Sequence, residues 1–321
     1  MISMVLVAYW LCLATVFGIA APNGPLKSHI TGGLKGIQMR NSGSDLDCNQ
    51  FTSDYDVLFH FSFLIMINPI NTNWQKSVAK TNEDGTLVIE LSLRSEDSVP
   101  LSIFCLKNLR DLTIYNTSFP SGIVPDNLEN LEQLTSLNFY MSPIVYMTKY
   151  LGTLKNLYNL SLRSCSLTDL PDLSGLLKLS SLILNDNQLS QIHGVPNIPH
   201  LELVTNLFTE IPIMKNPDSL RILSMNNNPL KNILTITSHI NLYILNLGHV
   251  RLSSVPPTIG KLKELETLDL SNNALFYLPT NMFQLTKLKT LYIHNNMFSV
   301  DDTQTFQNQF SSFLPNMTLI S

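Results

Sequence analysis

The chain has 321 residues, of which 14% are charged and 44% are hydrophobic, and its formal net charge is −4. An average domain is roughly 25% charged, and this chain has no basic surface or run of like charges to suggest a nucleic-acid partner or an interaction tail. Length alone suggests about two domains, but the internal repeats described below favour one elongated unit.

The first segment of the chain is typical of an export signal. Residues 5–21 are apolar, and Gly18 and Ala20 are small residues at a suitable spacing for cleavage after Ala20. We therefore predict a signal peptide over residues 1–20 and a secreted, extracellular or cell-surface product. No Lys or Arg precedes the apolar run, so an uncleaved membrane anchor is the alternative. No later stretch reaches the roughly 18 apolar residues that span a bilayer.

The segment before the repeats predicts a flexible lead followed by a cap. Residues 22–45 are rich in Gly, Ser, Asn and Pro, a composition typical of loops. The apolar stretch 54–67 predicts a short amphipathic helix, with Ser53 or Asp54 as its N-cap and Pro69 ending it. Such a helix would cover the open apolar end of the first repeat.

Three cysteines remain once the signal peptide is removed. Cys48 and Cys105 flank the start of the repeats and are candidates for a disulfide in an oxidising compartment, although spacing alone does not establish the bond. Cys165 lies inside a repeat, where a small apolar side chain fits.

One pattern recurs nine times between Leu106 and Phe298, every 19 to 25 residues, with leucine-like residues at its first, fourth and sixth positions. A period in this range indicates a solenoid. Residues 88–93, after a turn at 82–85, form a degenerate first copy, which makes about ten repeats. Alternation predicts a strand with its leucines inward. The chain then returns within about 15 residues, enough for a 3-10 turn or a short helix.

An asparagine recurs just after most strands and is predicted to be structural. Its amide can donate to and accept from the backbone of adjacent turns, so that stacked copies form a ladder. Thr117, Ser142 and Cys165 can each donate one bond in its place, but Val250 cannot, which predicts a local break. The asparagines of the ladder are Asn187, Asn206, Asn228, Asn273 and Asn296.

These repeats resemble those of leucine-rich-repeat proteins over roughly residues 87–300. The preceding stretch, with Asn68-Pro69 and Asn73-Trp74, is similar to the N-terminal cap of plant-type extracellular members, although it lacks the cysteine pair that usually follows the Trp. The resemblance implies an α/β leucine-rich-repeat solenoid, with a curved parallel β-sheet on its concave face and short helical, 3-10 and loop segments on its convex face.

The concave face is the predicted ligand-binding surface, because it carries the variable residues between the leucines. Tyr and Arg are enriched in binding hot spots, and several fall on adjacent repeats of the N-terminal half. The ligand-binding candidates are Arg94, Tyr115, Tyr140, Arg163 and Asn185.

Three sequons predict glycosylation at Asn116, Asn159 and Asn316 if the chain is exported. Asn159 falls on the concave face in the same strand as Arg163. A glycan at Asn159 would block that part of the groove and argue against the Tyr115–Arg163 surface as the site.

The C-terminal segment 301–321 is predicted to be a cap, since Phe306, Phe310, Phe313 and Leu314 share one helical face. The expected organisation is a signal peptide (1–20), a lead and N-terminal cap (21–86), repeats (87–300) and the C-terminal cap (301–321).

No nucleophile, phosphate-binding or metal-ligand pattern occurs, so no catalytic site, metal or cofactor is expected. We predict a non-catalytic protein-protein interaction module that binds a protein or peptide ligand. Two alternatives stay open. One is a matrix protein that binds glycan, and the other is an intracellular regulatory or scaffold subunit of an enzyme such as a phosphatase.

Overall fold

The computed structural model describes residues 46–70 and 76–321. Residues 43–321 form one unit, to which all the described residues belong. The predicted signal peptide at 1–20, the lead up to residue 45 and the Asn73-Trp74 pair lie outside the described residues.

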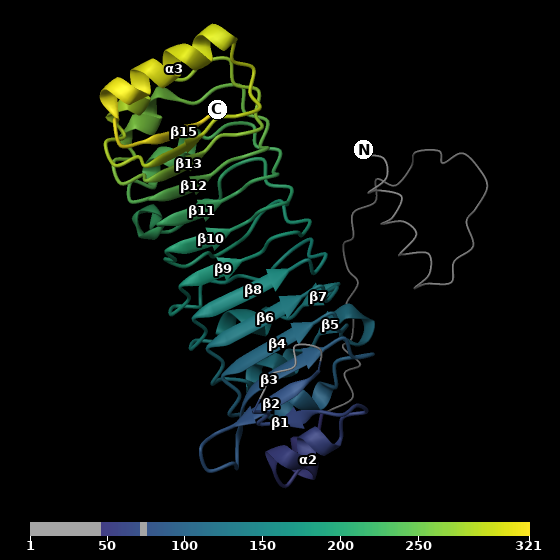
Figure 1. Ribbon diagram of the computed structural model, residues 1–321. Coiled ribbons are helices and arrows are strands. Elements are labelled where there is room, and N and C mark those ends of the chain that lie inside the picture. The colour runs from purple at the N-terminus through teal and green to yellow at the C-terminus, as the bar shows by residue number, and fades with distance from the viewer. Residues whose placement is uncertain (1–45, 71–75) are drawn as a thin grey trace, which may run out of the picture. The chain divides into compact units, whose positions relative to one another are not determined.

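The repeats stack side by side as strands of one long sheet (Figure 1). Within the described residues this sheet has 13 hydrogen-bonded strands. Two further short strands pair with each other in a second, separate sheet. The pairs from β3 onward are parallel, as the repeat pattern predicts. The strands of the long sheet are β1 (Met66–Ile67), β2 (Val78–Thr81), β3 (Val88–Arg94), β4 (Asp111–Tyr115), β6 (Ser136–Tyr140), β8 (Asn159–Arg163), β9 (Ser181–Ile183), β10 (His200–Glu202), β11 (Ile222–Ser224), β12 (Ile244–Asn246), β13 (Thr267–Asp269), β14 (Thr290–Tyr292) and β15 (Thr318–Ile320), and the small sheet pairs β5 (Ile123–Val124) with β7 (Tyr146–Met147).

The inward leucines form one column through the core. Leu91 of β3 is in register with Leu112 of β4, and the same register continues strand by strand to Leu291 of β14. These leucines are at most 1% exposed. Burying a leucine side chain stabilises a fold by roughly 2 kcal/mol, so the repeated column is the main stabilising feature of the solenoid.

Short 3-10 helices return the chain on the side away from the sheet, as the repeat length predicts. Proline begins several of them: Pro256 and Pro279 are the N-caps of two. Proline suits this position because it has no N–H to donate to a strand ladder. The 3-10 helices span Cys48–Gln50, Leu101–Cys105, Pro120–Gly122, Asp126–Asn130, Lys149–Thr153, Pro217–Ser219, Leu234–Ser238, Pro257–Lys261 and Thr280–Gln284.

The N-terminal cap differs from the expected helix over 54–67. Helix α2 covers only Asp54–Phe59, with Ser53 as its N-cap. The chain then extends as β1, which pairs with β2 and adds a strand to the N-terminal end of the sheet. Strand β2 runs antiparallel to β3, because the predicted turn at 82–85 joins them directly, with Gly85 N–H donating to the Asn82 carbonyl over 3.0 Å.

The C-terminal cap has the expected helix and one further strand. Helix α3 spans Val300–Phe313, and β15 pairs with β14 to extend the sheet. Phe306, Phe310 and Leu314 are buried, but Phe313 is 61% exposed, so its predicted place on the buried face is wrong. Its ring stacks on Phe283 instead, with centroids 4.7 Å apart.

The asparagine ladder joins each turn to its neighbours. Asn228 is 2% exposed, and its amide donates to the carbonyls of Leu203, Met225 and Asn226 while its oxygen accepts from the Phe208 N–H. Asn187, Asn206, Asn273 and Asn296 bond in the same way.

Val250 interrupts this ladder, and the backbone repairs the break. In the other repeats the oxygen of a ladder asparagine accepts from a backbone N–H of the preceding repeat. Asn273, for example, accepts from the N–H of Leu252, which lies two residues after Val250. At Val250 the corresponding donor, Leu230 N–H, bonds to the Asn228 carbonyl over 3.0 Å. The break therefore removes a link between repeats without leaving this donor unsatisfied.

Candidate ligand-binding face of the sheet

Four of the predicted ligand-binding residues form one row across the sheet. Strand register pairs Arg94 with Tyr115, Tyr115 with Tyr140, and Tyr140 with Arg163. These four residues, on β3, β4, β6 and β8, are called the Tyr–Arg row below. Each is the last residue of its strand and points away from the leucine column. Adjacent strands lie about 4.8 Å apart, so the row is a continuous strip of two aromatic rings between two guanidinium groups.

The row is accessible along its length. Tyr115 is 38% exposed, and the side chain of Arg163 is 39% exposed. The guanidinium carbon of Arg94 lies 5.7 Å from the centroid of the Tyr115 ring, within the range of a cation–π contact. Such a contact limits the motion of both side chains, which lowers the entropy lost when a ligand orders them.

A carboxylate network holds the Arg163 end of the row. Glu202 Oε2 lies 3.5 Å from Arg163 Nη2 and accepts from Asn185 Nδ2 over 2.7 Å, and its Oε1 lies 2.9 Å from His200 Nε2. The bond from His200 is the largest cause that lowers the pKa of Glu202, followed by those from Asn185 and the Arg163 charge, and together they exceed the opposing effect of burial. Glu202 therefore stays ionised and orients Arg163.

Asn185 has a different place from the one expected. It is only 8% exposed, its amide nitrogen donates to Glu202, and its oxygen accepts from the Val204 N–H over 2.9 Å. Both ends of the amide are thus engaged within the protein. Asn185 positions Glu202 rather than offering a free group on the surface. The repeat pattern does not single out Glu202 as the hub of this network, because a lone acidic residue between leucines is unremarkable.

Beside the row, the sheet surface is polar and internally bonded. Asn138 donates to Ser136 Oγ over 2.8 Å and to Thr113 Oγ1 over 3.4 Å, and Asn159 donates to Asn138 Oδ1 over 3.3 Å. Burial raises the pKa of Asp111, although hydrogen bonds from Ser136 and Thr113 oppose the shift. These bonds leave the Tyr–Arg row as the more available part of the N-terminal half.

The three sequons lie at different distances from the row. Asn159 is partly buried at the start of β8, so four residues, or about 13 Å of strand, separate it from Arg163. Asn316 is exposed near the C-terminal cap. Asn116 is exposed directly after Tyr115, with its amide 3.2 Å from Ser95 Oγ. A glycan at Asn116 would therefore stand nearer the row than one at Asn159.

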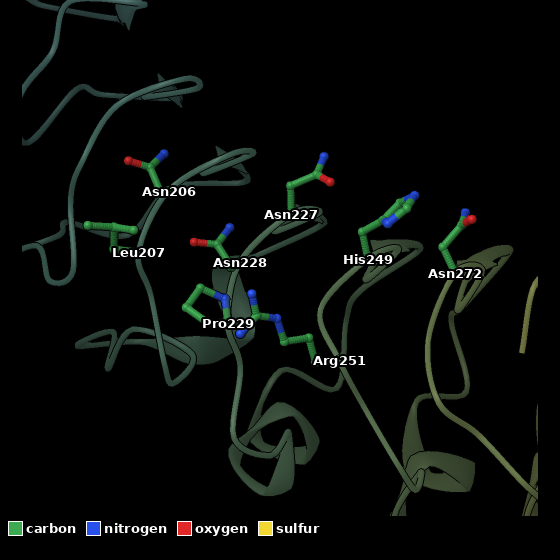
Figure 2. A pocket seen from close by; sticks show the side chains of 8 residues that line it. All are labelled: Asn206, Leu207, Asn227, Asn228, Pro229, His249, Arg251 and Asn272. Carbon is green, nitrogen blue, oxygen red and sulfur yellow. The ribbon is translucent and has the colours of Figure 1, made fainter. Parts of the chain in front are cut away.

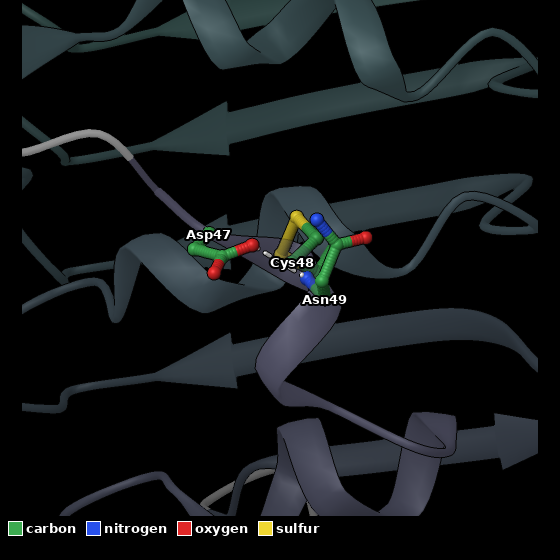
Figure 3. Close-up of a disulfide and its surroundings, with 4 residues drawn as sticks. Asp47, Cys48 and Asn49 are labelled. Atoms are coloured by element: carbon green, nitrogen blue, oxygen red, sulfur yellow. Dashed lines mark hydrogen bonds between the residues drawn. A yellow bond between two sulfur atoms is a disulfide. The ribbon is translucent and has the colours of Figure 1, made fainter.

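A disulfide ties the N-terminal cap to the first return segment. Cys48 and Cys105 are bonded, with their Cα atoms 5.4 Å apart, and Asp47 accepts from the Asn49 N–H over 2.9 Å beside the bond (Figure 3). Cys165 is a buried free thiol, and burial raises its pKa to about 12. It is thus protonated and unreactive at neutral pH.

Residues 46–70 and 76–321 contain neither a metal-binding cluster nor a membrane-spanning helix. In this part of the chain no group of three or more His, Cys, Asp or Glu side chains is placed to hold a metal ion. None of its helices is both long and apolar enough to cross a membrane.

Comparison with known proteins places the repeats in a recognised class. Residues 240–298 match the family described as leucine rich repeat. The chain is 29% identical over 150 residues to the leucine-rich repeat-containing G-protein coupled receptor 5 of Rattus norvegicus, a match that covers 44% of this chain and 16% of that receptor. It is 28% identical over 188 residues to receptor-like protein 7 of Arabidopsis thaliana, covering 54% of this chain and 19% of that protein.

A solved structure supports the same architecture. The plant peptide hormone receptor RGFR1 in complex with RGF2 aligns with a TM-score of 0.52 at 22% identity, covering 65% of this chain and 36% of that chain. At this identity the likeness concerns the fold alone. This chain thus spans less than a fifth of the length of the two receptor relatives. Repeats of this kind present extended binding surfaces, and they are typically non-catalytic.

Proposed function

We propose that this leucine-rich-repeat protein is a secreted or cell-surface module that binds a protein or peptide ligand along the Tyr–Arg row of its sheet. The observation that carries the proposal is the register of Arg94, Tyr115, Tyr140 and Arg163 in one partly exposed strip of the sheet. Tyr and Arg offer large contact area and charge-assisted hydrogen bonds, and they dominate binding hot spots.

An extracellular site of action is supported by two independent features. The Cys48–Cys105 disulfide is a type of bond that persists in oxidising compartments. Residues 1–20 have the composition of a signal peptide. In the proposed organisation, residues 21–86 are the lead and plant-like cap, residues 87–300 are the repeats and residues 301–321 are the C-terminal cap. The receptor relatives make the same compartment a reasonable proposal for this chain.

The test is an affinity capture from extracellular material with the full chain produced through a secretory host. A triple variant, Tyr115→Ala, Tyr140→Ala and Arg163→Ala, is expected to lose at least tenfold of the captured protein or peptide ligand, because truncating a hot spot costs about 2 kcal/mol. The matched control is Tyr158→Ala, which removes a 60% exposed tyrosine just before β8.

Three outcomes would each contradict a part of this proposal. Equal capture by the triple variant and the wild type would remove the Tyr–Arg row from the binding surface. A full-length, unglycosylated chain found in the cytosol would remove the extracellular assignment and favour an intracellular scaffold. Captured material that disappears after glycosidase treatment would instead favour a glycan ligand. Mass spectrometry of the mature chain, expected to begin near Ala21, reports on processing in the same experiment.

A further inference from the structure

A pocket of about 440 Å³ opens between successive turns at the carboxyl ends of β10–β13 (Figure 2). It lies in the C-terminal half of the repeats, on other strands than those of the Tyr–Arg row. Eight residues line it, and none of them is acidic. Asn227, His249 and Arg251 contribute polar side chains from two consecutive repeats, beside those of Asn206, Asn228 and Asn272, and Leu207 and Pro229 supply its apolar wall.

Six of the lining side chains are polar, and three of these are engaged, Asn206 and Asn228 in the asparagine ladder and Asn272 with Asn295 and Ser271. Among the described residues, none makes a hydrogen bond or ion pair with the side chains of Asn227, His249 or Arg251. Figure 2 shows these three side chains on neighbouring turns of the pocket.

The backbone that carries Arg251 is in an uncommon conformation. Each turn has one residue in the left-handed region just before its ladder position, such as Asn227 at φ 58° and His249 at φ 56°. In this turn Arg251 is left-handed as well, at φ 66°. A left-handed conformation costs a residue with a long side chain roughly 1–2 kcal/mol. Ser166, which follows the ladder position of Cys165, has the same conformation at φ 57°, so the second left-handed residue occurs in two turns whose ladder position is not asparagine.

Val250, which directly precedes Arg251, is the break in the asparagine ladder. The ladder asparagine that would cross to the preceding repeat is missing here, and Leu230 N–H has turned to the Asn228 carbonyl instead. The break in the ladder thus coincides with the second left-handed residue and with the pocket. Arg251 remains exposed, and Leu207 is 51% exposed at the opposite wall.

We propose that this turn pocket binds a carboxylate displayed by a peptide, with Arg251 as its bidentate donor. A guanidinium matches a carboxylate in geometry and charge. The Asn227 amide and the His249 ring supply further donors to the carboxylate or to the peptide backbone. Leu207 and Pro229 cover the apolar carbons that carry the carboxylate. The site is separate from the Tyr–Arg row, so the two proposals succeed or fail independently.

The test uses the isotopically labelled full chain and three short peptides: acetyl-Gly-Leu with a free carboxylate, the same peptide as its amide, and acetyl-Gly-Glu-amide. Arginine Nε–Hε and histidine ring resonances are followed by NMR during titration. The two carboxylate peptides are expected to shift the Arg251 and His249 signals with a dissociation constant of about 1 mM. The uncharged amide is expected to bind about tenfold more weakly, because it lacks a charge-assisted bond.

The variants make the result specific to the pocket. Arg251→Gln is expected to weaken the carboxylate peptides about tenfold, and Arg251→Lys to give an intermediate loss. Arg110→Gln removes an exposed arginine from the opposite strand ends and should change nothing. Comparing the two carboxylate peptides tells a chain end from an acidic side chain as the source. Equal binding of acid and amide, or unchanged binding by a folded Arg251→Gln chain, would overturn the proposal.

Discussion

Asn226 on the turn side of β11 and Asp269 at the end of β13 are joined directly over an intervening strand, with Asn226 Nδ2 donating to Asp269 Oδ2 over 3.1 Å. Gly248 follows β12 between them, and a Cβ there would lie 2.9 Å from Asp269 Oδ2 and 3.0 Å from Asn226 Nδ2. The missing side chain is what permits a hydrogen bond between repeats that are not neighbours.

Gly248→Ala is therefore expected to push the two side chains apart and break their bond. The loss in free energy of unfolding should be about 1 kcal/mol, since the obstructing atoms are side-chain ends that can move. Denaturant unfolding measures the cost of Gly248→Ala in the wild type and again in an Asn226→Ala background. The difference between the two costs is the coupling energy between Gly248 and Asn226. If the hydrogen bond is the cause, the cost of Gly248→Ala shrinks markedly in that background, whereas an unchanged cost would point to backbone strain.

A second prediction concerns the break in the asparagine ladder. Val250→Asn is expected to stabilise the chain by about 1 kcal/mol, because the new amide can reach the Leu230 N–H and the Met225 and Leu247 carbonyls. The reverse change, Asn228→Val, should cost about 1–3 kcal/mol by removing three donated bonds and one accepted bond. Thermal and denaturant unfolding measure both. A loss of stability in Val250→Asn would mean that the valine packing outweighs the missing link.

A structural feature could be predicted from the sequence where its cause lies within a single repeat. The leucine column and the Asn187–Asn296 ladder could be predicted because each repeat specifies them within its own few residues. Strands β1, β2 and β15 could not, since Met66–Ile67 and Thr318–Ile320 are too short to have a period and become strands only by pairing with the ends of the sheet.

The candidate site divides in the same way. The outward direction of Tyr115 and Tyr140 follows from alternation along a strand, and their register follows from the repeat. The burial of Asn185 does not, because it depends on Glu202 in the next repeat, whose carboxylate takes up its amide. The exposed place of Phe313 likewise depends on a ring, Phe283, that comes from a return segment.

A third prediction concerns the disulfide, which closes a loop of 57 residues. Replacing both partners, Cys48→Ser with Cys105→Ser, should lower the free energy of unfolding by about 4 kcal/mol in the chain-entropy account. Because each repeat contacts only its neighbours, the loss should be local. Hydrogen exchange is expected to speed up in α2, β2 and β3 and to stay unchanged near α3. Cys165→Ala, which leaves the disulfide intact, is the control, and a uniform loss of protection along the repeats would contradict local coupling.

The last prediction follows from the carboxylate network at the Arg163 end of the Tyr–Arg row. The pKa of Glu202 is lowered below its ordinary value of 4.5 by His200, Asn185 and Arg163. A carboxylate with a depressed folded-state pKa contributes stability above its unfolded pKa, and that contribution is lost as pH falls through the folded value. The titration of Glu202 itself should therefore contribute a constant difference in free energy of unfolding between wild type and Glu202→Gln above about pH 5.

On acidification below that range the difference between the two chains should shrink. This difference in free energy of unfolding should stay below about 1 kcal/mol, as for other partly exposed ion pairs. Taking the difference between the chains matters because burial raises the pKa of Asp54 and Asp111, whose contributions have the opposite sign and are common to both. Denaturant unfolding from neutral pH to below pH 4 provides the measurement. A difference that stays flat through this range would mean that Glu202 is not stabilised in its ionised form, and that something else orients Arg163.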